Sequence, residues 1–495
     1  MIPVKFIGPA YTMDSLDISA QKCVNMYLEA YLDSGAKVQM SLRPTHGLLS
    51  FASLNGAQQI RGLYLASTGA FFAVMGTQVQ TVSTAGTPTN QFNLSTGSAP
   101  GSATIVRFAD TAASANRTTV NSGETALLIA DGTTNAYTYN ISTDVATQIT
   151  DSAYPGGSFC GILDGYYIVN KPDTLFAYYS DLEEPTSWNT TQTLTKESTT
   201  DNINGLIVND GKVWLFGTLG YEIHRHTGQS TNRFLRIAGT SREIGLHAPD
   251  SLKSDGTSVY WVGGSATGFG KIYRSQGFEA VPISTIPMER AIHGYSTTTD
   301  AEGLTFQQDG HSFYQVTFPS ENKTWVYDAS VSAILGQPVW HEKLYRNPNT
   351  SVDERHRARV AAFFNNKNYF GDWATNDVYS AEQTTYTDNT QTIIRNRTSP
   401  TTWNARERIF YKTFELDIER GVGLATGQGS APLVMIRWSD DSGHTWSNKY
   451  QMDVGAIGEY GPRVKRERLG QARERVWEIT YSEPTKFNLM GAFVD

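Results

Sequence analysis

Apolar and polar residues alternate in a repeated unit along the middle of the chain. Between about residues 56 and 400, an apolar stretch, a tight turn and a second apolar, aromatic stretch follow one another again and again. The clearest examples are residues 61–75, 159–169, 206–216, 254–262 and 361–370. Turns of the Asp-Gly or Asn-Asn kind between half-buried stretches are typical of β-hairpins. The pattern therefore predicts a series of small antiparallel sheets.

The spacing of these hairpins predicts a β-propeller over residues 56–400. It is ~40–50 residues, which is the period of propeller blades. A small sheet cannot bury its apolar face alone, and radial stacking buries that face while leaving only short edges. We expect six or seven blades, with the seventh left open because the repeat is degenerate. We also expect Trp214 or Phe216, which alternate on one strand, to pack between blades.

The two ends of the chain follow a different pattern. Residues 401–495 contain strand-like stretches in which Trp477, Ile479 and Tyr481 face one way while Glu478 and Thr480 face the other. We expect this region to form a small β-sandwich-like platform domain. Residues 1–55 show no core of their own, so we expect them to be extended, to dock on this platform and to supply one or two of its strands.

Composition agrees with an all-β fold and narrows the possible functions. The 495 residues include 12% aromatic side chains, 44 glycines and only 18% charged residues, which argues against disorder and against a helical bundle. The net charge of −8 disfavours a general nucleic-acid coat. Cys23 and Cys160 provide neither a disulfide framework nor a zinc site. We expect no cofactor, no signal peptide and no membrane span.

One motif, at residues 439–446, raises an enzymatic alternative. Ser439, Asp441, Gly443 and Trp446 fit the Asp-box pattern of a hairpin turn, in which Asp441 binds turn amides and Trp446 packs beneath. Sialidase propellers carry several Asp-boxes, whereas this sequence has one, outside the propeller region. We therefore interpret it as a structural turn.

Other candidate sites are weaker. His224 and His226 would share one face of a strand, as two metal ligands do, but no third ligand is signalled nearby. Asp181, Glu183 and Glu184 offer carboxylates near Trp188, as a glycosidase would need, yet acidic loops are common on acidic proteins. The Gly-x-Ser-x-Gly motif of serine hydrolases is absent. We expect neither a catalytic nor a metal site, and no enzymatic activity.

A basic run near the C-terminus stands out on this acidic chain. Two interpretations are open: a solvated, ion-paired hairpin, or a surface that docks an acidic partner or a phosphate backbone. We favour a protein interface, because the acidic total disfavours DNA. The candidate interface residues are Arg463, Lys465, Arg466, Arg468, Arg473 and Arg475.

Four segments near the two ends resemble one known family. Together and in this order they are similar to the packaged DNA stabilization protein of short-tailed bacteriophages of enteric bacteria, also called the tail nozzle or tail accessory factor. Each motif alone is weak, but the ordered set is fairly specific, and the resemblance covers the whole chain. The segments are residues 25–30, 43–49, 439–446 and 468–477.

This resemblance implies a structural virion protein without catalytic residues. Several copies, six by expectation, would form a ring below the portal and its adaptor, close the channel after DNA packaging and conduct DNA at ejection. The tail needle and the tailspikes would be neighbours, contact with double-stranded DNA would be transient, and no small-molecule substrate would be bound. The protein would be assembled in the host bacterial cytoplasm and reside in the virion tail.

The alternative is a glycan-binding or glycan-processing propeller, such as an adhesin or a sialidase-like protein. Repeated Asp-boxes or an arginine cluster on inner blade strands would favour it, and the sequence shows neither.

Overall fold

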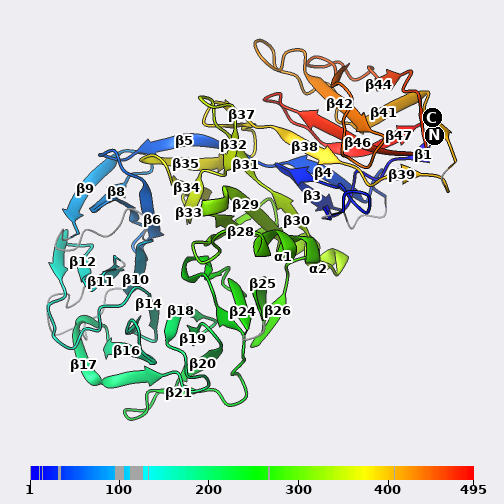
Figure 1. The fold of residues 1–495 in the computed structure, drawn as a ribbon. Coiled ribbons are helices and arrows are strands. Elements are labelled where there is room, and N and C mark those ends of the chain that lie inside the picture. The colour runs from blue at the N-terminus through cyan, green and yellow to red at the C-terminus, as the bar shows by residue number, and fades with distance from the viewer. Residues whose placement is uncertain are drawn as a thin grey trace.

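The computed structural model of the chain describes residues 2–10, 12–13, 15–31, 35–94, 105–111, 126–131, 133–265, 268–405 and 407–495. Across these residues the fold is almost entirely β-structure. A ring of small sheets is joined on one side to a second β-structure, in which both ends of the chain lie (Figure 1). None of the described helices is long and apolar enough to cross a membrane.

Seven antiparallel sheets stand around a central axis as the blades of a propeller (Figure 1), so the predicted all-β propeller is confirmed with seven blades. Each of the first four blades is a hairpin repeat of four consecutive strands. They are β6 (Ile60–Leu65), β7 (Phe71–Met75), β8 (Gln78–Val82) and β9 (Pro88–Asn93); β10 (Arg107–Thr111), β11 (Ala126–Ala130), β12 (Ala136–Asn140) and β13 (Val145–Gln148); β14 (Cys160–Leu163), β15 (Tyr166–Asn170), β16 (Phe176–Asp181) and β17 (Glu184–Thr195); and β18 (Ile203–Asn209), β19 (Lys212–Gly217), β20 (Tyr221–His226) and β21 (Phe234–Arg236).

The last three blades carry the connections to the rest of the molecule. Blade five is β22 (Gly245–Leu246), β23 (Lys253–Ser254), β24 (Val259–Ser265), β25 (Gly268–Gln276) and β26 (Glu279–Pro282). Blade six is β27 (Glu302–Gln308), β28 (His311–Phe318), β29 (Lys323–Asp328) and β30 (Trp340–Glu342). Blade seven is β33 (Ala358–Phe364), β34 (Lys367–Asp372), β35 (Asp377–Glu382) and β5 (Gly47–Ser53). Short elements lie between them: η1 (Pro249–Ser251), α1 (Ile286–His293), η2 (Pro319–Glu321), α2 (Ala329–Leu335), the β31 (Leu344–Arg346) and β32 (Asp353–Arg355) pair, β36 (Thr387–Asp388) and β37 (Gln391–Thr392).

Strand β5 closes the propeller ring. It pairs antiparallel with β35, from Ser53 opposite Asp377 to Gly47 opposite Glu382, although the two strands are more than 300 residues apart in sequence. This pairing completes the seventh blade, and β33 of that blade packs against β6 of the first. A ring closed by backbone hydrogen bonds leaves few unpaired strand edges.

The second β-structure is a sandwich of two sheets. The first sheet runs β3 (Met26–Ala30), β4 (Met40–Pro44), β47 (Leu489–Val494), β41 (Thr413–Ile418) and β44 (Val464–Glu467), with β1 (Ile2–Pro3) beside β47. The second runs β2 (Cys23–Val24), β38 (Arg395–Thr398), β46 (Glu474–Tyr481), β42 (Leu433–Ser439) and β43 (Tyr450–Asp453). Two short strands, β39 (Thr402–Trp403) and β40 (Ile409–Phe410), pair with β46 and with β45 (Gln471–Ala472) respectively. Trp477, Ile479 and Tyr481 face the core between the sheets, and all three are buried.

The N-terminal residues belong to both parts of the molecule. Strands β1, β3 and β4 lie in the first sandwich sheet, whereas β5 lies in the propeller. Strand β2 lies between the propeller and the sandwich. It pairs with β30 of blade six, where Val24 is opposite Glu342, and with β38 of the sandwich, where Val24 is opposite Asn396. The sheet of blade six is therefore hydrogen-bonded without interruption to a sandwich sheet, and the two parts are fastened together by backbone.

Asn25 fixes this crossing point. It is buried and adopts the left-handed conformation, with φ of 54°, which Asn tolerates better than most residues. Its side-chain amide donates to the carbonyls of Leu344 (3.1 Å) and Ile394 (2.9 Å), and its side-chain oxygen accepts from the Leu344 amide at 2.9 Å. One side chain thus holds the exit of blade six and the entry to the sandwich.

Aromatic residues fill the space between blades four and five. Trp214 and Phe216 on β19 are both buried. The Phe216 ring lies 5.1 Å from the ring of Trp261 in blade five, and the Trp214 ring lies 6.4 Å from that of Phe278. Both residues that the alternating pattern marked therefore pack between blades.

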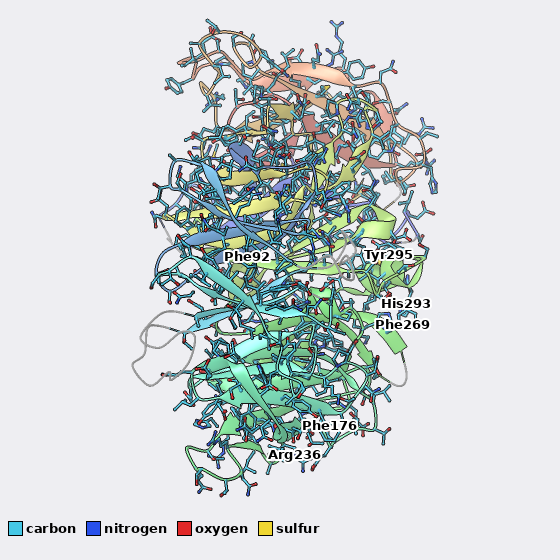
Figure 2. All side chains as sticks on the ribbon, turned by 90° about the vertical axis from the view of Figure 1, so that its left-hand side faces the viewer. Phe92, Phe176, Arg236, Phe269, His293 and Tyr295 are labelled. Carbon is cyan, nitrogen blue, oxygen red and sulfur yellow. The ribbon has the colours of Figure 1, made fainter. Side chains whose placement is uncertain are left out.

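We predict that Phe216→Ala lowers the free energy of unfolding by about 3–5 kcal/mol, because it leaves a cavity between two blades. Urea denaturation followed by tryptophan fluorescence measures the change. Phe176→Ala is the control, because that ring is exposed at the end of the propeller far from the sandwich (Figure 2). Equal stability of Phe216→Ala and Phe176→Ala would contradict the packing.

We predict that Asn25→Ala lowers the free energy of unfolding by about 2–4 kcal/mol, because the backbone carbonyls of Leu344 and Ile394 lose their hydrogen-bond donor. Asn25→Gly should recover a part of this loss, because glycine adopts a positive φ without strain. Thermal unfolding of both variants separates the two contributions. The fastening role is wrong if the alanine variant melts at the wild-type temperature.

Candidate protein-docking site

The basic segment lies at one edge of the sandwich. Strand β44 pairs with β41 and, within the described residues, with no other strand, so its outer edge faces solvent. Arg463 and Lys465 are exposed there, and both are already in ion pairs. The Arg463 guanidinium donates to both carboxylate oxygens of Glu415, and Lys465 lies 2.5 Å from Glu467. The hydrogen bond from Arg463 lowers the pKa of the Glu415 carboxyl.

The next three cations lie on β44 and in the chain that follows it. The Arg466 guanidinium lies 4.6 Å from the centre of the Tyr450 ring, which itself stacks on Trp438 at 5.3 Å. Arg468 is exposed in the turn that follows β44, where its φ is 62°. Arg473 is exposed between β45 and β46. Cations held at fixed positions can steer an acidic partner and fix its orientation.

Arg475 differs from the expectation of a solvent-facing docking residue. Its side chain is buried, with 1% exposure, and donates to both carboxylate oxygens of Asp440 at 2.5 and 2.8 Å and to the Leu469 carbonyl at 2.6 Å. The guanidinium also lies 4.5 Å from the centre of the Tyr411 ring. Arg475 therefore fastens the basic segment to the sandwich, and its charge is not offered to a partner.

The Asp-box motif forms the turn between β42 and β43. Ser439 donates a hydrogen bond to Asp441, and Asp441 accepts from the amide and the hydroxyl of Thr445 at 2.8 and 2.6 Å. These hydrogen bonds lower the pKa of Asp441 to about 2. Gly443 has φ of 101°, and the Trp446 ring lies 4.6 Å from the Arg437 guanidinium. The carboxylate of Asp441 and the hydroxyl of Ser439 are both engaged within the turn, which fits a structural role.

The other candidate residues are dispersed in internal contacts. His224 is buried 2.7 Å from Glu222, and His226 lies 2.8 Å from Asp164. Asp181 accepts hydrogen bonds from Ser187 and Gln192. In the part of the chain that the structure describes, no three His, Cys, Asp or Glu side chains gather as metal ligands would. Cys23 and Cys160 are free thiols.

A polar network at the junction of propeller and sandwich is not signalled by any sequence motif. His46 lies 2.7 Å from Asp309. His311 lies 2.7 Å from Asp328 and 3.5 Å from Glu29. Burial opposes charge on His311, but Asp328 and Glu29 outweigh it and raise the pKa of its ring. These residues come from the first hairpin of the chain and from blade six, so only the fold brings them together.

Two family models cover nearly the entire chain. Residues 2–386 match the β-propeller of bacteriophage P22 Gp10, and residues 394–495 match its β-sandwich. The chain belongs to the family of bacteriophage P22 Gp10. This is a phage stabilisation protein family, so membership confirms the resemblance seen in the sequence and gives the chain a structural role in a phage virion.

The other comparisons gave no match or only distant ones. A search of curated proteins gave no match. Among solved structures, virginiamycin B lyase from Staphylococcus aureus is 9% identical with a TM-score of 0.43, covering 67% of this chain and 98% of its own. The N-terminal domain of Nup159 is 9% identical with a TM-score of 0.38, covering 77% of this chain and 99% of its own.

We predict that His341 makes the protein acid-sensitive. Burial, together with the charges of Lys343 and His311, lowers the pKa of His341 from 6.5 to about 3. Below pH 6.5 the His341 ring therefore binds a proton in the unfolded chain but stays neutral in the folded chain. The free energy of unfolding consequently falls as the pH drops toward 3. Between pH 7 and pH 5 this group alone should remove about 2 kcal/mol.

Urea denaturation at the two pH values, in wild type and in His341→Gln, measures this contribution. The variant should lose about 2 kcal/mol less than wild type between pH 7 and pH 5, whatever its stability at pH 7. An equal loss in both proteins would show that His341 does not stay neutral in the fold.

Proposed function

We propose that copies of this chain, six in number, assemble into a ring below the portal and its adaptor, close the DNA channel after packaging, retain the genome and conduct it at ejection. The observation that carries this proposal is the match of the phage stabilisation family to both domains of the chain. In this role the protein is a non-enzymatic tail component, assembled in the host cytoplasm, with the tail needle and tailspikes as neighbours.

Two physical features support a channel role. The unbroken sheet from blade six into the sandwich allows each copy to resist the pressure of packaged DNA as one body. The net charge of −8 per copy gives a ring an acidic character. An acidic lumen repels the phosphate backbone, so transient DNA contacts would let the duplex slide instead of holding it.

We further propose that the sandwich, with the N-terminal strands folded into it, docks on the portal–adaptor complex. The docking residues would be the exposed and half-buried members of the basic segment, and buried Arg475 would hold the segment in place. The charges would raise the encounter rate and set the orientation more than they add affinity. The docking residues are Arg463, Lys465, Arg466, Arg468 and Arg473.

We predict that Arg466→Glu together with Arg468→Glu leaves the protein folded but slows its association with purified portal–adaptor complex at low salt by about tenfold or more. Raised salt should weaken wild-type binding and reduce the difference in association rate between wild type and the double variant, because salt screens exposed charges. Binding kinetics by surface plasmon resonance at several salt concentrations give both quantities. Phage particles carrying the double variant should package DNA and then leak it.

A matched control reverses two exposed cations of the propeller, Arg225→Glu with Lys271→Glu. It changes the net charge equally and should bind as wild type does. Unchanged association and DNA retention in the Arg466 and Arg468 variant would show that the basic segment is only a solvated hairpin. Failure of wild-type protein to bind the portal–adaptor complex, judged also by negative-stain microscopy, would refute the proposed function itself.

A further inference from the structure

Two large aromatic side chains are exposed beside the basic segment. Trp403 on β39 is 64% exposed and Phe410 on β40 is 69% exposed. Single exposed apolar residues are ordinary on a protein surface, but an exposed tryptophan and phenylalanine close together are not. Their positions in the fold decide whether they form one surface.

Both aromatic residues lie on short strands that pair with the chain segment 471–475. Trp403 pairs with Glu474, and Phe410 pairs with Gln471. Directly opposed residues of antiparallel strands project from the same face, and Glu474 and Gln471 are both exposed, whereas Ala472 is buried. Positions 471 and 474 are three residues apart, on either side of a bend at Arg473, so the two exposed rings belong to strands that pair with adjoining stretches of one chain segment.

A hollow of about 370 Å³ adjoins the Phe410 ring. Its lining includes Lys412 and Arg468, together with Glu467 and Gly470. A partner side chain can therefore settle beside Phe410 with cations at the rim. Aromatic and arginine residues around a hollow are the composition of binding hot spots.

The surroundings are strongly basic although the chain is acidic. Among the described residues of 402–413 and 463–475 that are not buried, seven are Lys or Arg and three are Glu, on a chain whose net charge is −8. Two copies of this surface would repel each other, so a symmetric self-contact through it is disfavoured. The charge fits a partner with an acidic surface.

The backbone beneath the surface is fixed. The Tyr411 amide donates to the Gly470 carbonyl at 2.9 Å, the Leu469 amide to the Tyr411 carbonyl at 3.1 Å, and the Arg468 amide to the Lys412 carbonyl at 2.9 Å. Buried Arg475 ties Leu469 to Asp440 from below. A surface that is ordered before binding loses little entropy when a partner binds.

We propose that Trp403 and Phe410 are the apolar anchors through which the sandwich binds an acidic protein surface that offers apolar sockets. The partner's identity rests on the proposed function: it is the portal–adaptor complex. The arginines bring the two surfaces together in register, and the two rings then bury apolar area and slow dissociation. The anchors and the charges therefore act on different rate constants.

The test measures association and dissociation rates of Trp403→Ala and Phe410→Ala on immobilised portal–adaptor complex. Each variant should dissociate about tenfold or more faster than wild type, with little change in association rate or in its salt dependence. Both should melt at the wild-type temperature, because the removed rings are exposed. Phe363→Ala, which removes an aromatic ring of 56% exposure from blade seven, is the matched control and should behave as wild type.

The outcomes separate this inference from the proposed function. If wild type binds and both variants dissociate at the wild-type rate, the anchors are wrong while the docking proposal stands. If wild type does not bind the complex at all, both fall. If the variants bind the complex normally but lower the molar mass of the free protein in light scattering, the rings contact a second copy, which also overturns the inference.

Discussion

The structure depends on backbone pairing by the first fifty residues with strands that lie hundreds of residues away. Strand β5 completes blade seven, and β2 joins blade six to the sandwich. Since β4 ends at Pro44 and β5 begins at Gly47, the two parts are linked by a connection too short to hinge widely. Asn25 and the His46–Asp309 pair then occupy the space between them. The N-terminal segment is thus the fastening on which both domains rely.

Local patterns predicted the parts of the fold that local physics determines. The hairpin repeats indicated a propeller because turn residues and alternating strands act within about ten residues of each other. Ring closure by β5 could not be predicted in this way, because β5 pairs with the unpaired edge of a blade that is more than 300 residues away in sequence. The same holds for the junction histidines, whose contacts join the N-terminal segment to blade six.

In the basic segment, residue type alone does not predict whether a side chain is buried or exposed. Arg475 and Arg473 are alike in sequence, yet one is buried against Asp440 and the other is exposed. Between Ala472 and Arg475 two successive residues face outward, so simple alternation fails and the arginine falls on the inner side. Trp403 and Phe410 carry no sequence signal for the opposite reason. Aromatic residues in strands usually belong to the core, whereas these two, on β39 and β40, are exposed.

The closure of the propeller by β5 also sets an order of events during synthesis. Its residues leave the ribosome early, while the strand they pair with is made more than 300 residues later. At ~5–20 residues per second, the gap lasts roughly 15 to 65 s. Throughout that time the nascent chain carries an unpaired β-strand, the kind of edge that aggregates most readily. The native ring can therefore be completed only after residues 377–382 have been made, and until then the fold has to be protected from wrong pairing of β5.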